Sequence, residues 1–147
     1  MNTLAGLSVG YVPHGPAMDR PFDRRRFPRF ARAWGLDLDL VEDWSDHDVY
    51  VLSPSADVTH WVHAPADVRL VVDIPDAYMA EAWSPRRAVR GLAKWVGGET
   101  SRPVASYRGA VQRLLRRADA VVCSTVDQGV DVSSFNDNAH PILDLHG

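Results

Sequence analysis

The sequence predicts an α/β fold, with a doubly wound, mostly parallel, Rossmann-like sheet in a three-layer α/β/α arrangement. Short apolar runs alternate with helical segments along the whole chain. Most of these runs show no regular polar alternation, which is typical of strands buried on both faces. Buried strands separated by helices are usually parallel and joined by right-handed crossovers. We therefore expect one Rossmann-like domain over residues 1–147.

Six segments have the length and composition of strands. The segment 36–41 alternates apolar and acidic residues, which predicts a strand with one wetter face, near an edge of the sheet. The other five are more continuously apolar and predict buried strands. They cover residues 7–12, 48–53, 69–74, 119–125 and 140–146.

Helical signals occupy the intervening segments. The segment 22–35 has an apolar face at helical spacing, and Pro28 marks either a kink or the true start of that helix. Further helices are expected over 85–96 and 103–117. A capping box predicts another helix after the fifth strand. The face of the first helix consists of Phe27, Phe30, Ala31 and Trp34.

Composition excludes several classes of protein. The net charge of −3 gives no basic excess, so a nucleic-acid partner is not expected. The single cysteine, Cys123, rules out an internal disulfide framework and is interpreted as a small buried hydrophobe. The N-terminus lacks a signal-peptide pattern, and no apolar window approaches the length of a membrane span. We expect a soluble, cytoplasmic protein.

Two carboxylates follow the fourth strand, in the sequence VVDIPDAY. In a doubly wound sheet, residues beyond the carboxyl ends of strands face the ligand crevice, near the point where strand order reverses. This rule makes Asp73 and Asp76 candidate ligand-facing groups. The alternative is that they cap a turn or a helix, and Pro75 between them is compatible with a turn.

The loop after the first strand, PHGP, contains the candidate catalytic residue His14. A histidine oriented by Asp73 or Asp76 could take a proton from a hydroxyl group; the alternative is an ordinary surface histidine. Gly15 could let the backbone approach a ligand closely. The loop is not G-x-G-x-x-G, and no suitably placed acidic residue follows the second strand, so NAD is not an expected cofactor.

Ser124, Thr125 and Gln128 lie at the end of the fifth strand and the start of a helix. Such a position can hold an anion or a sugar hydroxyl. The alternative is simple helix capping, since Thr125 and Gln128 have the spacing of a capping box. Arginine groups at 24–26, 86–90 and 113–117 are interpreted as solvated helix faces. The first of these groups could also touch a phosphate.

Two patterns suggest metal sites but have simpler explanations. The D-x-D of residues 37–39 lies on one face of an alternating strand, which indicates a solvated face. Asp57, His60 and His63 lie within one or two helical turns, as metal ligands can. An inward-packed Trp61 with a histidine on either side explains the same pattern.

The chain resembles the N-terminal domain of a glycosyltransferase of the two-Rossmann (GT-B) type. The resemblance is strongest to the group that includes many bacterial sugar transferases of retaining stereochemistry. It follows the element order of the whole chain, and three stretches carry it. These are VVDIPDAY (71–78), LLRRADAVVCSTVDQ (114–128) and NAHPILDLHG (138–147).

The resemblance implies transfer of a sugar from a nucleotide-sugar donor to a hydroxyl acceptor. In this family a second domain supplies most of the donor site, so we expect residues 1–147 to be the acceptor-side half and to be inactive alone. Metal dependence is not expected. PHGP replaces the family's glycine pair, which argues against donor-phosphate contacts at that loop.

His14 and Asp76 would then be the catalytic residues. An inverting enzyme would use His14 as the base, whereas in a retaining enzyme it would contact substrate. Alternative functions are a non-catalytic binding module on the same fold and a small nucleotide-binding protein complete in itself. The substrate-binding residues would be Gly15, Asp73, Tyr78, Ser124, Thr125 and Gln128.

Overall fold

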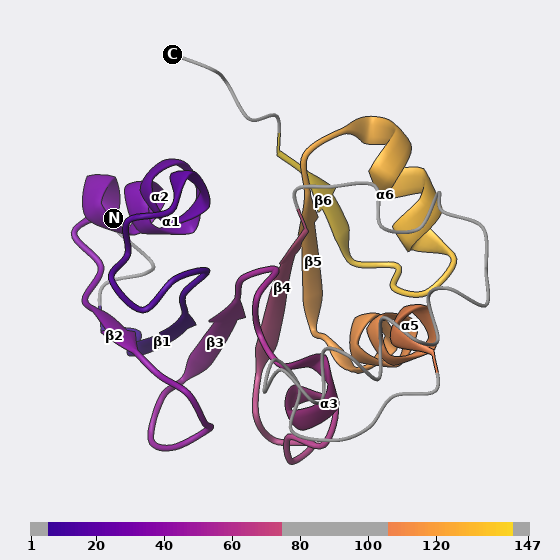
Figure 1. Cartoon of the computed structure of the whole chain (residues 1–147), viewed down its shortest axis with the longest axis horizontal. Coiled ribbons are helices and arrows are strands. Elements are labelled where there is room, and N and C mark those ends of the chain that lie inside the picture. The colour runs from indigo at the N-terminus through magenta and orange to yellow at the C-terminus, as the bar shows by residue number, and fades with distance from the viewer. Residues whose placement is uncertain (1–5, 75–105, 143–147) are drawn as a thin grey trace.

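The computed structural model describes residues 6–74 and 106–142, which contain one six-stranded sheet (Figure 1). All the strand pairings are parallel, so the predicted α/β class with a parallel sheet is confirmed. The strands are β1 (Val9–Val12), β2 (Leu38–Leu40), β3 (Val49–Leu52), β4 (Leu70–Ile74), β5 (Ala120–Cys123) and β6 (Ala139–Pro141).

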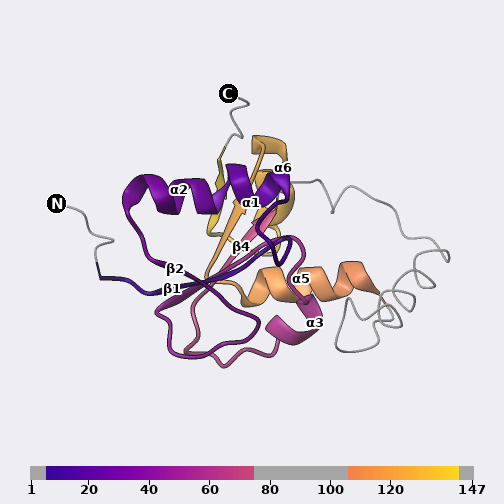
Figure 2. The ribbon, with the colours of Figure 1, turned by 60° about the vertical axis from the view of Figure 1, so that its left-hand side comes forward.

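Helices cover both faces of the sheet. Figure 2 shows α1 (Pro21–Arg25) and α2 (Phe27–Trp34) above the sheet, and α3 (Val58–Trp61) and α5 (Tyr107–Arg117) below it. Helix α6 (Val126–Ser133) shares the core cluster of α3 and α5. The predicted three-layer arrangement is therefore confirmed.

The strand order is β2-β1-β3-β4-β5-β6. The chain moves from β1 outward to β2, and then crosses to β3 and continues outward in the other direction. Strand order therefore reverses between β1 and β3, where a doubly wound sheet forms its crevice. The acidic strand β2 lies at one edge, as its alternating sequence predicts.

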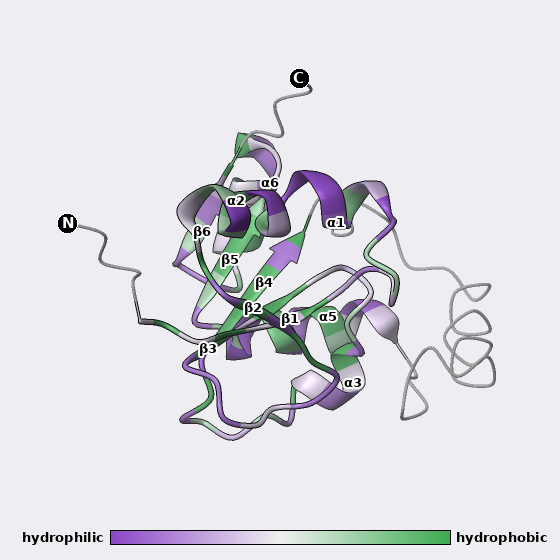
Figure 3. Cartoon of the chain, turned by 90° about the vertical axis from the view of Figure 1, so that its left-hand side faces the viewer, coloured by the Kyte–Doolittle hydropathy of each residue, from purple (hydrophilic) through white to green (hydrophobic). Residues whose placement is uncertain are grey.

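The larger core cluster lies between the sheet and the layer of α3, α5 and α6. Leu52, Leu70, Leu115 and Val121 are completely buried there, and Trp61 is 1% exposed. Burial of each large apolar side chain contributes about 1.5–3 kcal/mol. Figure 3 shows the strands as mainly hydrophobic, except that the arrowhead of β4 is hydrophilic. The core thus ends at the carboxyl edge of β4.

A break in the helical ribbon separates α1 from α2. Pro28 occupies the first turn of α2, which confirms that it marks a helix start. α2 ends at Gly35, whose φ of 63° is the left-handed conformation that favours glycine. The predicted apolar face is only half buried, since Phe30 and Trp34 are 42% and 49% exposed.

The expectation that the arginines of 113–117 form a solvated helix face is wrong for Arg117. Arg113 and Arg116 are exposed, but the Arg117 guanidinium donates to the backbone oxygens of Ala64, Pro65 and Val68. It therefore ties the end of α5 to the loop before β4.

Several expectations fall outside the described residues. These are the helix predicted over 85–96, the arginines of 86–90, and the site residues Asp76 and Tyr78. In the two described ranges, no helix combines the length and the apolar character needed to cross a bilayer.

Candidate functional site

The candidate site lies at the carboxyl edge of the sheet. Val12 pairs with Leu52, Leu52 pairs with Val72, and Ile74 pairs with Cys123. This register brings the ends of β1, β3, β4 and β5 to nearly one level, so residues just beyond them share an edge. The sequence prediction that polar groups gather here rests on this geometry.

Arg26 joins the ends of β4 and β5. Its Nε and Nη2 donate to both carboxylate oxygens of Asp73 at 2.6–3.0 Å, and its Nη1 donates to Ser124 Oγ at 2.8 Å. Only 6% of the Arg26 side chain is exposed. The expectation that residues 24–26 form a solvated face is wrong for Arg26, which turns inward at the α1–α2 break; Arg24 and Arg25 are exposed.

Strand alternation explains why Asp73 meets Arg26. Val72 and Ile74 point into the larger core, so Asp73 points to the opposite face, beneath α1 and α2. The carboxylate is 4% exposed, and a buried charge needs a partner of opposite charge. Asp73 is thus a member of a structural ion pair at the predicted site, and its ligand role stays a prediction.

Asp23 anchors the loop that follows β1. Its Oδ1 accepts from the backbone N–H of His14 at 2.8 Å and from the Tyr11 hydroxyl at 2.9 Å. Its Oδ2 accepts from the N–H of Gly15 at 3.0 Å. Sequence reasoning missed Asp23, although its spacing from Phe27 and Ala31 places it on the buried helical face.

The imidazole of His14 contacts a serine and not Asp73, which binds Arg26; the other predicted partner, Asp76, lies outside the described residues. Its Nδ1 lies 2.6 Å from Ser55 Oγ, and its ring centroid lies 5.9 Å from that of Phe22. Ser55 follows β3, so this contact bridges the point where strand order reverses. Sequence reasoning missed Ser55, because nothing in its local sequence distinguishes it from a turn serine.

The capping box at the start of α6 is confirmed. Thr125 Oγ1 accepts from the Gln128 N–H at 3.2 Å, and Gln128 Oε1 accepts from the N–H groups of Ser124 and Thr125. Gln128 is 7% exposed, so its side chain is engaged in this cap. Thr125 is exposed, whereas Ser124 is half-buried against Arg26.

Burial controls the titration of two groups near this edge. It raises the pKa of Tyr11 far above its ordinary value, and the hydrogen bond to Asp23 acts in the same direction. Burial also raises the pKa of Cys123, with Arg26 opposing the effect and Asp73 reinforcing it. Both groups are therefore protonated and uncharged at neutral pH.

A small apolar pocket lies under the same edge, between β3, β4 and the helices on the core side. It has about 30 Å³ of space, enough for one or two water molecules. The Asp73 side chain is engaged on the opposite face. The lining residues include Ser53, Pro54, Val72, Ile74, Tyr107 and Leu114.

His60 of α3 has structural partners. Asp57 caps the helix by accepting from the Thr59 N–H at 2.9 Å. The His60 ring stacks on Trp44 with centroids 4.4 Å apart, and Trp61 packs inward. The simpler explanation of this pattern is therefore confirmed for Trp61.

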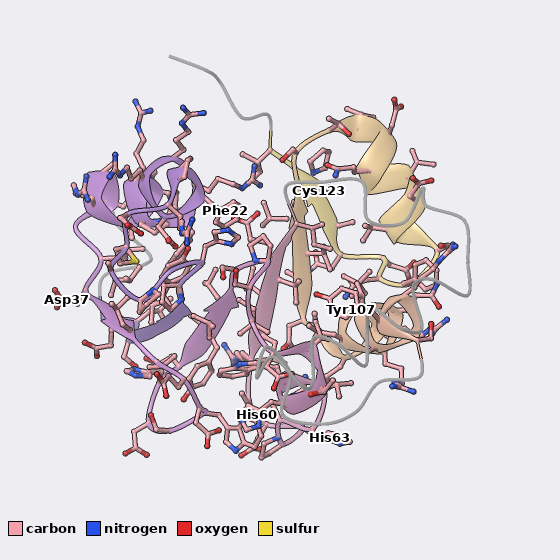
Figure 4. The ribbon with its side chains drawn as sticks, viewed as in Figure 1. Phe22, Asp37, His60, His63, Tyr107 and Cys123 are labelled. Atoms are coloured by element: carbon pink, nitrogen blue, oxygen red, sulfur yellow. The ribbon has the colours of Figure 1, made fainter. Side chains whose placement is uncertain are left out.

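His60 and His63 lie far from the candidate site. In Figure 4, His60 and His63 are at one end of the sheet, and Phe22 and Cys123 are toward the other. Among the residues that the structure describes, no group of three or more His, Cys, Asp or Glu could hold a metal ion. The exposed acidic pair at residues 37–39 agrees with a solvated strand face.

Comparisons with protein-family models, with curated proteins and with solved structures found no match for this chain.

The chemistry of the carboxyl edge follows from which of its side chains are already hydrogen-bonded within the protein. The carboxylates of Asp23 and Asp73 are satisfied within the protein. His14, Ser55 and Thr125 are exposed. The accessible groups are thus hydrogen-bonding groups suited to hydroxyl ligands.

Proposed function

We propose that this chain is the acceptor-side domain of a glycosyltransferase that moves a sugar from a nucleotide-sugar donor to a hydroxyl acceptor. The observation that supports it most is the His14–Ser55 contact of 2.6 Å at the reversal of strand order. A ligand hydroxyl at this place would meet an imidazole and a hydroxyl, both of which donate and accept hydrogen bonds.

The role of His14 depends on its tautomer. If the Nδ1–H donates to Ser55, Nε2 is an acceptor and can serve as a general base toward the acceptor hydroxyl. If the Ser55 hydroxyl donates to Nδ1, Nε2 carries the proton and donates to a substrate oxygen. The first arrangement suits an inverting reaction, and the second suits a retaining one.

The rest of the proposed reaction needs a second domain. That domain would carry most of the nucleotide-sugar site, and closure of the two would exclude water. The present edge would hold the acceptor in place, which raises its effective concentration. Asp76 belongs to this proposal as the second catalytic residue and Tyr78 as a further substrate contact, and a cytoplasmic location fits a nucleotide-sugar donor.

A transfer assay tests the proposal on the longest natural chain that contains residues 1–147. Labelled uridine and guanosine diphosphate sugars are offered with a panel of hydroxyl acceptors. We expect His14→Ala to lower the transfer rate about 10²–10⁴-fold if His14 is the base. His63→Ala, an exposed histidine at the other end of the sheet, is the matched control. Equal rates for both variants would remove His14 from the site.

A second candidate function is a non-catalytic binding module. It is favoured by the internal pairing of Asp73 with Arg26, which commits that carboxylate to the fold. This candidate predicts saturable binding of a hydroxyl ligand at the same edge without turnover of any donor in the panel. The transfer assay and a binding titration therefore separate the two functions.

A further inference from the structure

The backbone of the β1 loop is organised around an internal negative charge. The N–H groups of His14 and Gly15 are consecutive, and each donates to a different oxygen of the Asp23 carboxylate, at 2.8 and 3.0 Å. The Tyr11 hydroxyl adds a third bond at 2.9 Å. Asp23 is only 2% exposed. The carboxylate is therefore enclosed by donors from β1 and its loop.

Consecutive N–H groups that converge on one point are a common way for a protein to bind an anion. The loop after the first strand of a parallel sheet is also where such groups often meet a ligand phosphate. In this protein the same kind of N–H donors converge on the protein's own Asp23 carboxylate. The loop is close-packed at this place, since a Cβ on Gly15 would lie 2.9 Å from Arg20 Cγ.

We propose that Asp23 is a built-in occupant of the anion-binding position of the β1 loop, and that it makes this loop reject phosphate groups. A phosphate would have to displace a carboxylate that already holds two amides and a phenol. Its own negative charge would also lie close to that of the Asp23 carboxylate in a buried setting, which is strongly unfavourable. Asp23 is thus a specificity-determining residue that excludes phosphate and other anionic groups from the loop.

This inference goes beyond the proposed function, because it holds for any ligand of the edge, whether or not a sugar is transferred. It also gives a physical reason why PHGP is unsuited to donor-phosphate contacts. The exposed residues Arg24 and Arg25 do not change this, since the donors of the loop already face Asp23.

Anion rescue tests the proposal. Asp23→Ala removes the carboxylate but leaves its donors, so sodium formate or inorganic phosphate should bind in its place. We expect the Tm of Asp23→Ala to rise by on the order of 5 °C at 50 mM of either anion, relative to chloride at equal ionic strength. Asp19→Ala removes an exposed carboxylate nearby and, like the wild type, should show no such rise.

Nuclear magnetic resonance gives the site-specific readout. The amide signals of His14 and Gly15 should move in Asp23→Ala and return toward their wild-type positions with formate. If Asp23→Ala does not fold, Asp23→Asn replaces it, and at least one of the two amide signals should shift because the new amide cannot accept both bonds. The proposal would be overturned if the His14 and Gly15 amide signals did not shift in the folded variant, or if formate did not raise the Tm of Asp23→Ala. So would saturable shifts of these amides in wild type on adding phosphate.

Discussion

The guanidinium group of Arg26 donates hydrogen bonds to both oxygens of the Asp73 carboxylate, 47 residues away in sequence, at 2.6–3.0 Å. The two side chains are 6% and 4% exposed. Arg26 lies at the break between α1 and α2, and Asp73 lies near the end of β4. The pair therefore ties one helical layer to the carboxyl edge of the sheet.

Loss of Arg26 should strongly destabilise the fold. Arg26→Ala leaves Asp73 as a buried charge without this partner, which typically costs about 3–5 kcal/mol. Urea unfolding measures the free energy of unfolding. The exposed neighbour in Arg25→Ala is the matched control and should change it by less than about 0.5 kcal/mol. The ion pair would be unimportant if the two variants had equal stability.

The fold could be predicted because its signals are local. The apolar runs over 7–12, 48–53, 69–74 and 119–125 each contain one strand of the structure, and the acidic alternation of residues 36–41 placed β2 at the edge. Pro28 and the capping box marked helix starts that the structure confirms. Each of these features is defined by residues that are neighbours in the sequence, so it can be recognised from a single sequence.

The site could be predicted only in part, because its contacts join distant residues. The edge itself follows from parallel topology, and His14, Gly15, Asp73 and Ser124 lie along it. The partners of these residues did not follow from the sequence. Arg26 and Ser55 lie 47 and 41 residues from the groups they contact, and no periodicity encodes such pairs.

Tyr11 should make the protein sensitive to alkali. Burial and Asp23 raise its pKa above the ordinary value of about 10. The unfolded chain therefore loses this proton near pH 10 while the folded chain keeps it. This contribution to stability is complete below that pH and declines above it, by up to about 1.4 kcal/mol per pH unit.

Urea unfolding between pH 8 and pH 11 measures this effect. Tyr11→Phe keeps the ring but has no proton to lose, so its stability should fall less steeply above pH 10 than that of the wild type. Other groups titrate equally in both proteins and cancel in the difference. Parallel curves would contradict the inferred state of Tyr11.

The cap of α6 should respond to the hydroxyl of Thr125. Thr125→Ala removes the acceptor of the Gln128 N–H and should cost about 0.5–2 kcal/mol of stability. Thr125→Ser retains the hydroxyl and should stay close to the wild type. Thermal unfolding compares the three proteins, and an Ala variant as stable as the Ser variant would show that the cap contributes little.

Cys123 should be protected from thiol reagents in the folded protein. Its side chain is completely buried, and burial raises its pKa, so both access and thiolate formation are unfavourable. Ellman's reagent should react slowly with the native chain and rapidly in urea, where the thiol is exposed. Rapid, stoichiometric labelling without denaturant would contradict the packing of β5 against α6.

The central claim is that polar side chains at the carboxyl edge bind a hydroxyl ligand. Titration of the ¹⁵N-labelled chain with a panel of neutral glycosides, followed by nuclear magnetic resonance, tests it most directly. We predict saturable shifts of the amides of His14, Ser55 and Thr125 with at least one glycoside, and their loss in His14→Ala. Shifts centred on His60 and His63, or no saturable shift with any glycoside, would contradict the claim.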